Sequence, residues 1–348
     1  MSDQFTILIQ GPLNNVSLEN IENYKKFGTV IISHWDEKHS IIEKEFPILK
    51  KYKSDPKVKI ISKPLPDRND KIGIEKNSTF YWAVESCYHG FMACETEYVI
   101  KTRSDEYFTD LSEIINKTLQ SKGNVLVCGS IFVRNFMEIP FHVGDHIFGL
   151  KTESAKKMYQ HLMDMYNGKI QLEISSAQGI ATPFTKYGER KHNVCAEQIL
   201  GLCFLKKVLG FTDEDVVKGY LWTGKVDIWE PPNMVNKQEY VKNKLKKMSD
   251  NGYDYLQNND SLRGAIWQAV YVVDVNDLGD YQVRWAHGKK IWSSKGEKFT
   301  NPHGINNQKD LYSFFSNIEK TTIQAAKDGA SLQVDPRSEK GKSRILKR

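Results

Sequence analysis

The chemically most distinctive part of the chain is the segment Tyr98–Tyr107, in which an apolar run leads into a group of charged residues. Tyr98 to Thr102 has the composition of a buried strand, and Arg103, Asp105 and Glu106 follow it. Open α/β sheets bind ligands just beyond the carboxyl ends of their strands. Carboxylates placed there can bind a divalent cation, which in turn binds a diphosphate. A surface turn with merely solvated charges is the alternative, and it has about equal weight for an Asp-Glu pair alone.

Length and composition indicate a globular protein with a sizeable core. The chain has 348 residues, 40% of them hydrophobic, which predicts about two domains. The net charge is +6, with basic and acidic residues interleaved along the chain. This distribution argues against a specific nucleic-acid partner, because such proteins concentrate their basic residues on one face or arm. The exception is the basic segment 336–348, which we expect to be a disordered tail that either aids solubility or weakly contacts an anionic membrane surface.

The cysteines and the chain ends bear on the cellular compartment. There are five cysteines, an odd number without a CxxC pair, and most lie in apolar runs. We therefore expect reduced, buried thiols and a cytoplasmic protein. The N-terminus shows no secretory leader, and no stretch is apolar enough to span a bilayer.

Strand-like and helix-like segments alternate in the first half of the chain. Apolar, β-branched runs occur at Phe5–Ile9, Thr29–Ser33 and Val58–Ser62, with helical patterns at 18–27 and 38–51 between them. A further helical pattern precedes the run at Tyr98, and its apolar residues recur at spacings of three and four. This alternation predicts an α/β fold, an open, mostly parallel sheet flanked by helices.

Beyond the charged segment the pattern continues and then breaks down near Gly210. Helices are predicted at 111–119, 155–166 and 197–209, and strands at 125–133 and within 141–150. Later, 270–275 and 281–285 predict a small hairpin. We therefore predict a nucleotide-sugar-binding and catalytic domain at 1–210, a C-terminal extension at 211–335 that completes the cleft, and the basic tail at 336–348.

Five short segments resemble, in order, the WavE-type lipopolysaccharide-synthesis proteins, a family described as glycosyltransferases with the nucleotide-sugar-binding fold called GT-A. The segments are Ile7–Pro12, Ile31–Trp35, Lys101–Glu106, Gly144–Gly149 and Ala196–Gln198. The resemblance implies a GT-A-like fold and the transfer of a sugar from a nucleotide-diphosphate donor to a glycan, a lipid-linked glycan or another hydroxyl acceptor.

The resemblance also implies a metal site. GT-A enzymes end their fourth strand with an Asp-x-Asp motif whose last Asp binds Mn²⁺ or Mg²⁺. The matching triplet begins at Arg103, so Asp105 matches the metal ligand, with Glu106 beside it. His287 or His303 matches the further histidine ligand of the fold, although a loop histidine without a role is the alternative. Arg103 departs from the motif and can contact the diphosphate directly, since a guanidinium suits phosphate oxygens.

Two carboxylates are candidates for the general base that takes the proton of the acceptor hydroxyl. Glu197 comes first, because the fold often places a catalytic carboxylate at the start of a helix beyond the sheet. The helix dipole alone also favours a carboxylate at that position. Asp145 comes second, and it can instead bind hydroxyl groups of the donor sugar.

The ends of the first two strands and the start of the fourth helix are the expected nucleotide contacts. Base and ribose would lie at the strand ends, and the diphosphate at the helix N-terminus. Ordinary turn formation and capping are the alternative roles. The residues are Gln10, Gly11, Ser33, His34, Lys76 and Asn77.

Three functions compete. A metal-assisted glycosyltransferase is the leading hypothesis. A catalytically inactive nucleotide- or carbohydrate-binding protein is favoured by Arg103 in the motif. A nucleotidyltransferase is disfavoured, because its phosphate loop after the first strand would carry basic residues, and Gln10–Asn15 has none.

Overall fold

The computed structural model describes residues 2–13, 15–36, 49–65, 79–122, 125–131, 133, 142–167, 196–210, 270–284, 290–293, 305–310, 332–333 and 344–345. The chain divides into two compact units. The first comprises Met1–Ile131, Gly144–Ile170 and Tyr271–Pro302, and the second comprises Phe132–Val143, Gln171–Val270 and His303–Arg348.

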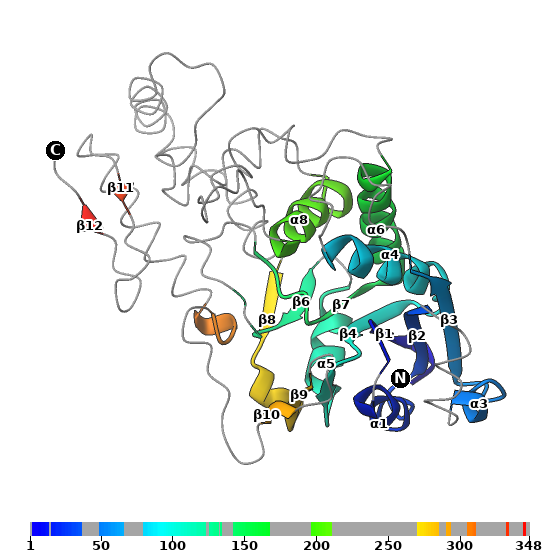
Figure 1. The fold of residues 1–348 in the computed structure, drawn as a ribbon. Coiled ribbons are helices and arrows are strands. Elements are labelled where there is room, and N and C mark those ends of the chain that lie inside the picture. Colours follow the sequence, from blue (N-terminus) through cyan, green and yellow to red (C-terminus); the bar gives the residue numbers. More distant parts are fainter. Residues whose placement is uncertain are drawn as a thin grey trace. The chain divides into compact units, whose positions relative to one another are not determined.

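The first unit is built on a seven-stranded sheet in the order β3-β2-β1-β4-β7-β6-β8 (Figure 1). Its strands are β1 (Phe5–Gln10), β2 (Thr29–Asp36), β3 (Val58–Pro64), β4 (Tyr98–Arg103), β6 (Leu126–Gly129), β7 (Ile147–Lys151) and β8 (Val270–Val273). The first four in this order are parallel, whereas β7 runs antiparallel to both β4 and β6. The predicted fold class, an open and mostly parallel α/β sheet, is confirmed.

Helices cover both faces of this sheet (Figure 1). They are α1 (Asn15–Tyr24), α3 (Leu49–Tyr52), α4 (Thr79–Met92), α5 (Ser112–Gln120) and α6 (Thr152–Tyr166). On one face α4 and α6 pack together, with the rings of Phe91 and Tyr159 4.6 Å apart between centroids. Each of these helices presents one apolar stripe to the sheet, as their three- and four-residue spacing predicts.

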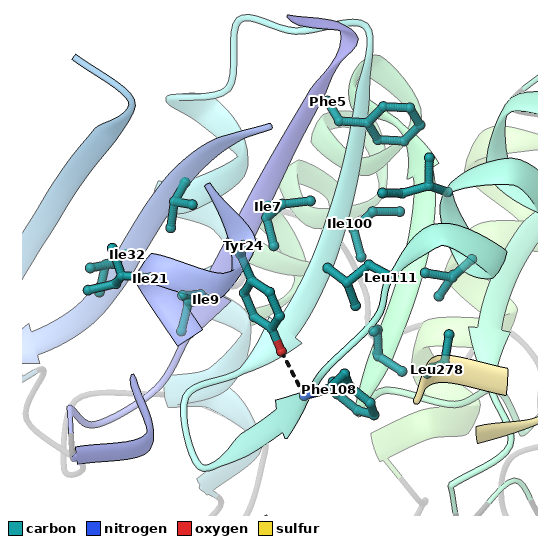
Figure 2. Close-up of a cluster of buried hydrophobic side chains, with 14 of the residues drawn as sticks. Phe5, Ile7, Ile9, Ile21, Tyr24, Ile32, Ile100, Phe108, Leu111 and Leu278 are labelled. Atoms are coloured by element: carbon teal, nitrogen blue, oxygen red, sulfur yellow. Dashed lines mark hydrogen bonds between the residues drawn. The ribbon is translucent and has the colours of Figure 1, made fainter. Parts of the chain in front are cut away.

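Strand β1 is buried on both faces, as a central parallel strand should be. Its odd-numbered side chains, Phe5, Ile7 and Ile9, lie in one apolar cluster with Ile21 and Tyr24 of α1 (Figure 2). The even-numbered side chains point to the other face, since side chains alternate along a strand. The strand thus joins the two helical layers and brings its carboxyl end to a fixed place.

A second, three-stranded antiparallel sheet has the order β10-β9-β5. It consists of β5 (Glu106–Phe108), β9 (Tyr281–Arg284) and β10 (Lys290–Ser293). The predicted hairpin is therefore wrong: both strands form, but β8 joins the seven-stranded sheet and β9 pairs with β5. The connection explains the difference, because Asp274 accepts a hydrogen bond from Asn276 N (2.9 Å) and caps a 3-10 helix, Val275–Leu278, in place of a tight turn.

In the second unit, α8 (Ala196–Cys203) continues into a π-helical turn, Phe204–Val208. Two short strands, β11 (Leu332–Gln333) and β12 (Arg344–Ile345), pair antiparallel. The second of these strands lies in the segment for which the sequence predicts disorder, and the rest of that segment lies outside the described residues.

Two expectations about composition can be checked on the described residues. Four cysteines are free and buried, in agreement with the prediction of reduced thiols: Cys87, Cys94, Cys128 and Cys203. Cys195 lies outside the described residues. Within the described ranges, none of the helices combines the length and apolar composition needed to cross a membrane.

Candidate functional site

Backbone hydrogen bonds tie together the carboxyl ends of β1, β2 and β4. Gly11 N donates to Ser33 O (3.1 Å), and Ser104 N donates to Gln10 O (2.8 Å). The strand order reverses at this point, because β2 lies on one side of β1 and β4 on the other. Open α/β sheets bind their ligands at such a reversal. The turn after β4 therefore lies at the edge where a ligand is expected.

Gly11 allows the loop after β1 to approach this turn closely. Its φ of +125° is one that residues with a Cβ rarely adopt, and a Cβ there would lie 2.6 Å from Ser104 Oγ. The Ser104 hydroxyl donates instead to Pro12 O (2.7 Å). Gly11, which the sequence suggested as a nucleotide contact, thus has a structural role that requires glycine.

A polar face of α1 holds the backbone of the same turn and of β5. Side chains three residues apart on a helix lie on one face, and here that face binds main-chain groups instead of water. The hydrogen bonds run from Ser17 Oγ to Ser104 O (3.0 Å), from Asn20 Nδ2 to Glu106 O (2.6 Å), from Asn23 Nδ2 to Phe108 O (2.7 Å) and from Phe108 N to Tyr24 Oη (3.1 Å; Figure 2). The sequence analysis missed this face, although its polar residues recur at a spacing of three.

Arg103 and Asp105 form a two-pronged ion pair at the end of β4. Arg103 Nε donates to Asp105 Oδ1 (2.9 Å), and its Nη2 donates to Oδ2 (2.8 Å). Paired hydrogen bonds of this kind are among the stronger polar contacts in proteins. The side chain of Arg103 is 33% exposed and that of Asp105 13% exposed, so the pair is only partly buried.

Glu106, the next residue along the chain, is completely buried. Its Oε1 accepts hydrogen bonds from Tyr281 Oη (2.9 Å) and from His146 Nδ1. Burial disfavours the charged carboxylate, but His146, Arg103 and Tyr281 together hold the pKa of Glu106 below its ordinary value. Burial also disfavours a charged His146, but Glu106 and then Asp145 raise the pKa of the imidazole. The two side chains therefore form a buried ion pair.

Asp145 lies beside this pair, and Lys101 anchors its backbone. Asp145 Oδ1 is 3.7 Å from His146 Nε2. Burial disfavours a charged Arg103, but Asp105 first, and then Glu106 and Asp145, raise the pKa of the guanidinium. The buried Lys101 ammonium donates to Asp145 O and lies 5.8 Å from the centroid of the Phe148 ring. The structure thus brings Asp145 and the Arg103 pair, both predicted from the sequence, into one cluster.

The charges of this cluster bear on the predicted metal. Cationic and acidic side chains occur in equal number when His146 is protonated: Lys101, Arg103 and His146 against Asp105, Glu106 and Asp145. Both oxygens of Asp105 accept from Arg103, and Glu106 is enclosed. Within the described residues, no three His, Cys, Asp or Glu side chains are arranged to hold a metal ion. The metal site predicted from the sequence stays a prediction, since its candidate ligands His287 and His303 lie outside the described residues.

The remaining nucleotide contacts predicted for the strand ends are largely engaged within the fold. Ser33 Oγ donates to Ser86 O (2.6 Å), and Ser86 Oγ donates to Ser33 O (2.9 Å), which locks α4 onto β2. His34 is buried, with Nδ1 3.2 Å from Trp35 O, and Gln10 is nearly buried. Four predicted site residues lie outside the described residues: Lys76, Asn77, His287 and His303.

Glu197, the first candidate for the general base, belongs to the second unit. It lies in the first turn of α8, as predicted, and its Oε2 is 3.9 Å from Nε2 of the buried His142. The sequence analysis did not single out His142.

Comparisons with known proteins leave the family open. No protein-family model matches the chain and no curated protein matches it, so the resemblance to WavE-type proteins is not confirmed. Among solved structures, HddC from Yersinia pseudotuberculosis is similar at 14% identity and a TM-score of 0.30, over 44% of this chain and 79% of HddC. The glycosyltransferase GlyE of Streptococcus pneumoniae TIGR4 is similar at 14% identity and a TM-score of 0.33, over 60% of this chain and 44% of GlyE. S. aureus TarS 1-349 is similar at 12% identity and a TM-score of 0.34, over 99% and 96%. At these values the similarities do not bear on function.

Proposed function

We propose that the chain is a glycosyltransferase that moves a sugar from a nucleotide-diphosphate donor to a hydroxyl group of a glycan or lipid-linked glycan. The observation that carries the proposal is the Arg103 guanidinium, which Asp105 holds at the carboxyl end of β4 on a partly exposed side chain. A guanidinium matches two phosphate oxygens at once, and this edge of an open α/β sheet is where ligands bind. The resemblance of five sequence segments to a glycosyltransferase family supports the transfer of a sugar.

In this proposal Arg103 stabilises the departing nucleotide diphosphate. Its N–H groups turn from the Asp105 carboxylate to phosphate oxygens, where they offset the charge that develops as the sugar leaves. Asp145 or Glu197 accepts the proton of the acceptor hydroxyl. Asp145 is the first to test, because it lies in the same unit as Arg103. Assistance by Mn²⁺ or Mg²⁺ stays a prediction.

The test is ligand binding followed by turnover. We would measure binding of UDP, GDP, CDP and ADP by calorimetry, with Mn²⁺ and with EDTA, and then hydrolysis of the matching sugar nucleotides. Arg103→Gln is expected to weaken binding roughly ten- to a hundredfold, the range for a lost hydrogen bond to a charged group. Lys157→Gln, which removes an exposed cation from α6, is the matched control. Equal affinity of wild type and Arg103→Gln would remove the observation on which the proposal rests.

A second candidate function is a nucleotide- or carbohydrate-binding protein without catalysis. It is favoured by the surroundings of one candidate base: Asp145 Oδ1 lies 3.7 Å from Nε2 of His146, the imidazole whose pKa is raised. A carboxylate beside a cation is a poor proton acceptor, since the cation favours its charged form. Binding of a nucleoside diphosphate without turnover of any donor would establish this second function.

The proposed partners and location have their own test. A lipid-linked acceptor would place the protein at the cytoplasmic face of a membrane, with the basic segment 336–348 in contact with anionic lipid. Cosedimentation with anionic vesicles should then be stronger for the full chain than for a chain truncated after Asp335. Equal cosedimentation would leave the tail without this role.

A further inference from the structure

We infer that Tyr281 and His146 are positioning residues, which act through Glu106 to fix the turn that presents Arg103 and Asp105 to a ligand. The sequence assigns neither of them a role. They come from distant parts of the chain, 175 and 40 residues from Glu106, and both reach the same carboxylate oxygen.

Tyr281 contacts β5 at two residues, Phe108 and Glu106. It lies directly opposite Phe108 in the register of β9 and β5, and the two rings stack with centroids 5.0 Å apart. Glu106 and Phe108 lie on one face of β5, because side chains two residues apart on a strand share a face. The Tyr281 hydroxyl therefore reaches along the strand and donates to Glu106 Oε1.

His146 is the second residue that contacts the Glu106 carboxylate. It immediately precedes β7, where the chain enters the seven-stranded sheet next to β4. Its Nδ1 donates to Oε1, so both donors converge on one oxygen. Glu106 Oε2 is buried and has no hydrogen-bond partner among the described residues. Among the described residues, the hydrogen bonds of this side chain are therefore the two at Oε1.

The anchored side chain controls the position of the ion pair, because only Ser104 and Asp105 separate β4 from β5. The backbone of this turn is held by α1 and by the loop after β1, β5 pairs with β9, and the Glu106 side chain adds a further anchor. A change in the backbone angles of Glu106 would swing Asp105 and thus the hydrogen bonds that orient Arg103. The three residues that meet at Oε1 act on a ligand only through this turn.

Hydrogen exchange measured by mass spectrometry on the full chain tests the inference without any assumption about function. Tyr281→Phe keeps the ring stack and removes only the hydroxyl, and His146→Gln removes the imidazole. Both should speed exchange in peptides covering 103–108 about five- to twentyfold, because the turn opens more often when an anchor is lost. Tyr271→Phe on β8 is the control, since its ring lies beside Lys117. Unchanged exchange at 103–108 in both variants would overturn the inference.

A binding experiment, which rests on the proposed function, separates positioning from mere stability. Tyr281→Phe should weaken binding of the nucleoside diphosphate that wild type prefers about five- to tenfold. In an Arg103→Lys background, which lacks the fork that the turn orients, the same change should have no further effect on affinity. The melting temperature should fall equally in both backgrounds. Equal losses of affinity in both backgrounds would overturn the inference. If wild type binds no nucleoside diphosphate, the proposed function fails, and the exchange experiment decides the inference alone.

Discussion

Arg103 and Asp105 share one pair of hydrogen bonds, and this sharing decides what each can offer a ligand. While Asp105 accepts from the guanidinium, a phosphate must compete with a carboxylate for the same N–H groups. A metal cation must likewise compete with the guanidinium for the Asp105 oxygens, because both already accept from Arg103. A substitution at Asp105 therefore acts on phosphate binding and metal binding in opposite directions.

Asp105→Asn is expected to tighten nucleoside-diphosphate binding a few-fold in metal-free buffer, because Arg103 loses its competitor and an anion loses a like charge. Any gain in affinity from added Mn²⁺ should disappear in the variant if Asp105 is a metal ligand. Calorimetry with EDTA and with Mn²⁺ gives both comparisons. Weaker metal-free binding would show that Asp105 is needed mainly to orient Arg103.

Glu106→Gln is expected to destabilise the fold by about 3 kcal/mol, the low end of the range for a broken buried ion pair, because His146 can release its proton. Urea unfolding at neutral pH measures the loss. The control is Glu113→Gln, which breaks a partly exposed pair with Lys117 on α5 and should cost less than about 0.5 kcal/mol. Equal losses would mean that the Glu106 pair contributes no more than a surface pair.

The loss in Glu106→Gln should also depend on pH. Since the pKa of Glu106 lies below its ordinary 4.5, the Glu106 carboxylate contributes stability above pH 4.5 and loses it as the pH falls through the folded value. Since the pKa of His146 lies above its ordinary 6.5, the imidazolium contributes fully below pH 6.5 and loses its contribution as the pH rises through the folded value. The difference in unfolding free energy between wild type and Glu106→Gln should therefore be largest between pH 4.5 and pH 6.5 and smaller at lower and higher pH.

The ends of three strands meet where Gly11 approaches Ser104, so this contact fixes the relative positions of β1, β2 and β4. The neighbouring α1 adds hydrogen bonds to the same turn. The strand ends at the candidate site are therefore held together before any ligand binds. Binding then costs little conformational entropy of the backbone.

Gly11→Ala is expected to destabilise the protein by about 2–3 kcal/mol, because the new methyl group meets both a strained φ and the Ser104 hydroxyl. Gly210→Ala is the matched control. The φ of Gly210, +76°, would also strain an alanine, but nothing lies within 4 Å of a Cβ there. The control should lose about 1 kcal/mol. Adding Ser104→Ala to Gly11→Ala should recover part of the loss, and an unchanged loss would show that the hydroxyl contact is unimportant.

The two candidate bases belong to different units of the chain, Asp145 to the first and Glu197 to the second. Glu197→Gln is expected to keep donor binding and to slow transfer about a hundred- to ten-thousandfold, the usual contribution of a general base. Asp145→Asn is the paired test. Steady-state rates and donor affinities of both variants should show the loss in one of them only; near-normal transfer by Glu197→Gln would exclude that residue as the base.

The central strands could be predicted because each is a continuous apolar run bounded by turn residues. The pairing of β9 with β5 could not, since short strands far apart in the chain choose partners through tertiary contacts. Distance along the chain also explains which residues of the candidate site could be predicted. Arg103 and Asp105 are neighbours in sequence and were found, whereas Tyr281 and the polar face of α1 act on a turn that is remote from them in the chain.

The polar face of α1 has one more consequence, which concerns association between molecules. In the order β10-β9-β5, the strand β5 is an outer strand, and such strands expose main-chain groups that can recruit a strand of another molecule. Here Asn20 and Asn23 occupy the carbonyl oxygens of Glu106 and Phe108, and Tyr24 accepts from the Phe108 amide. The helix therefore covers the open side of β5, and a strand of another molecule cannot pair with the small sheet at this edge without displacing these side chains.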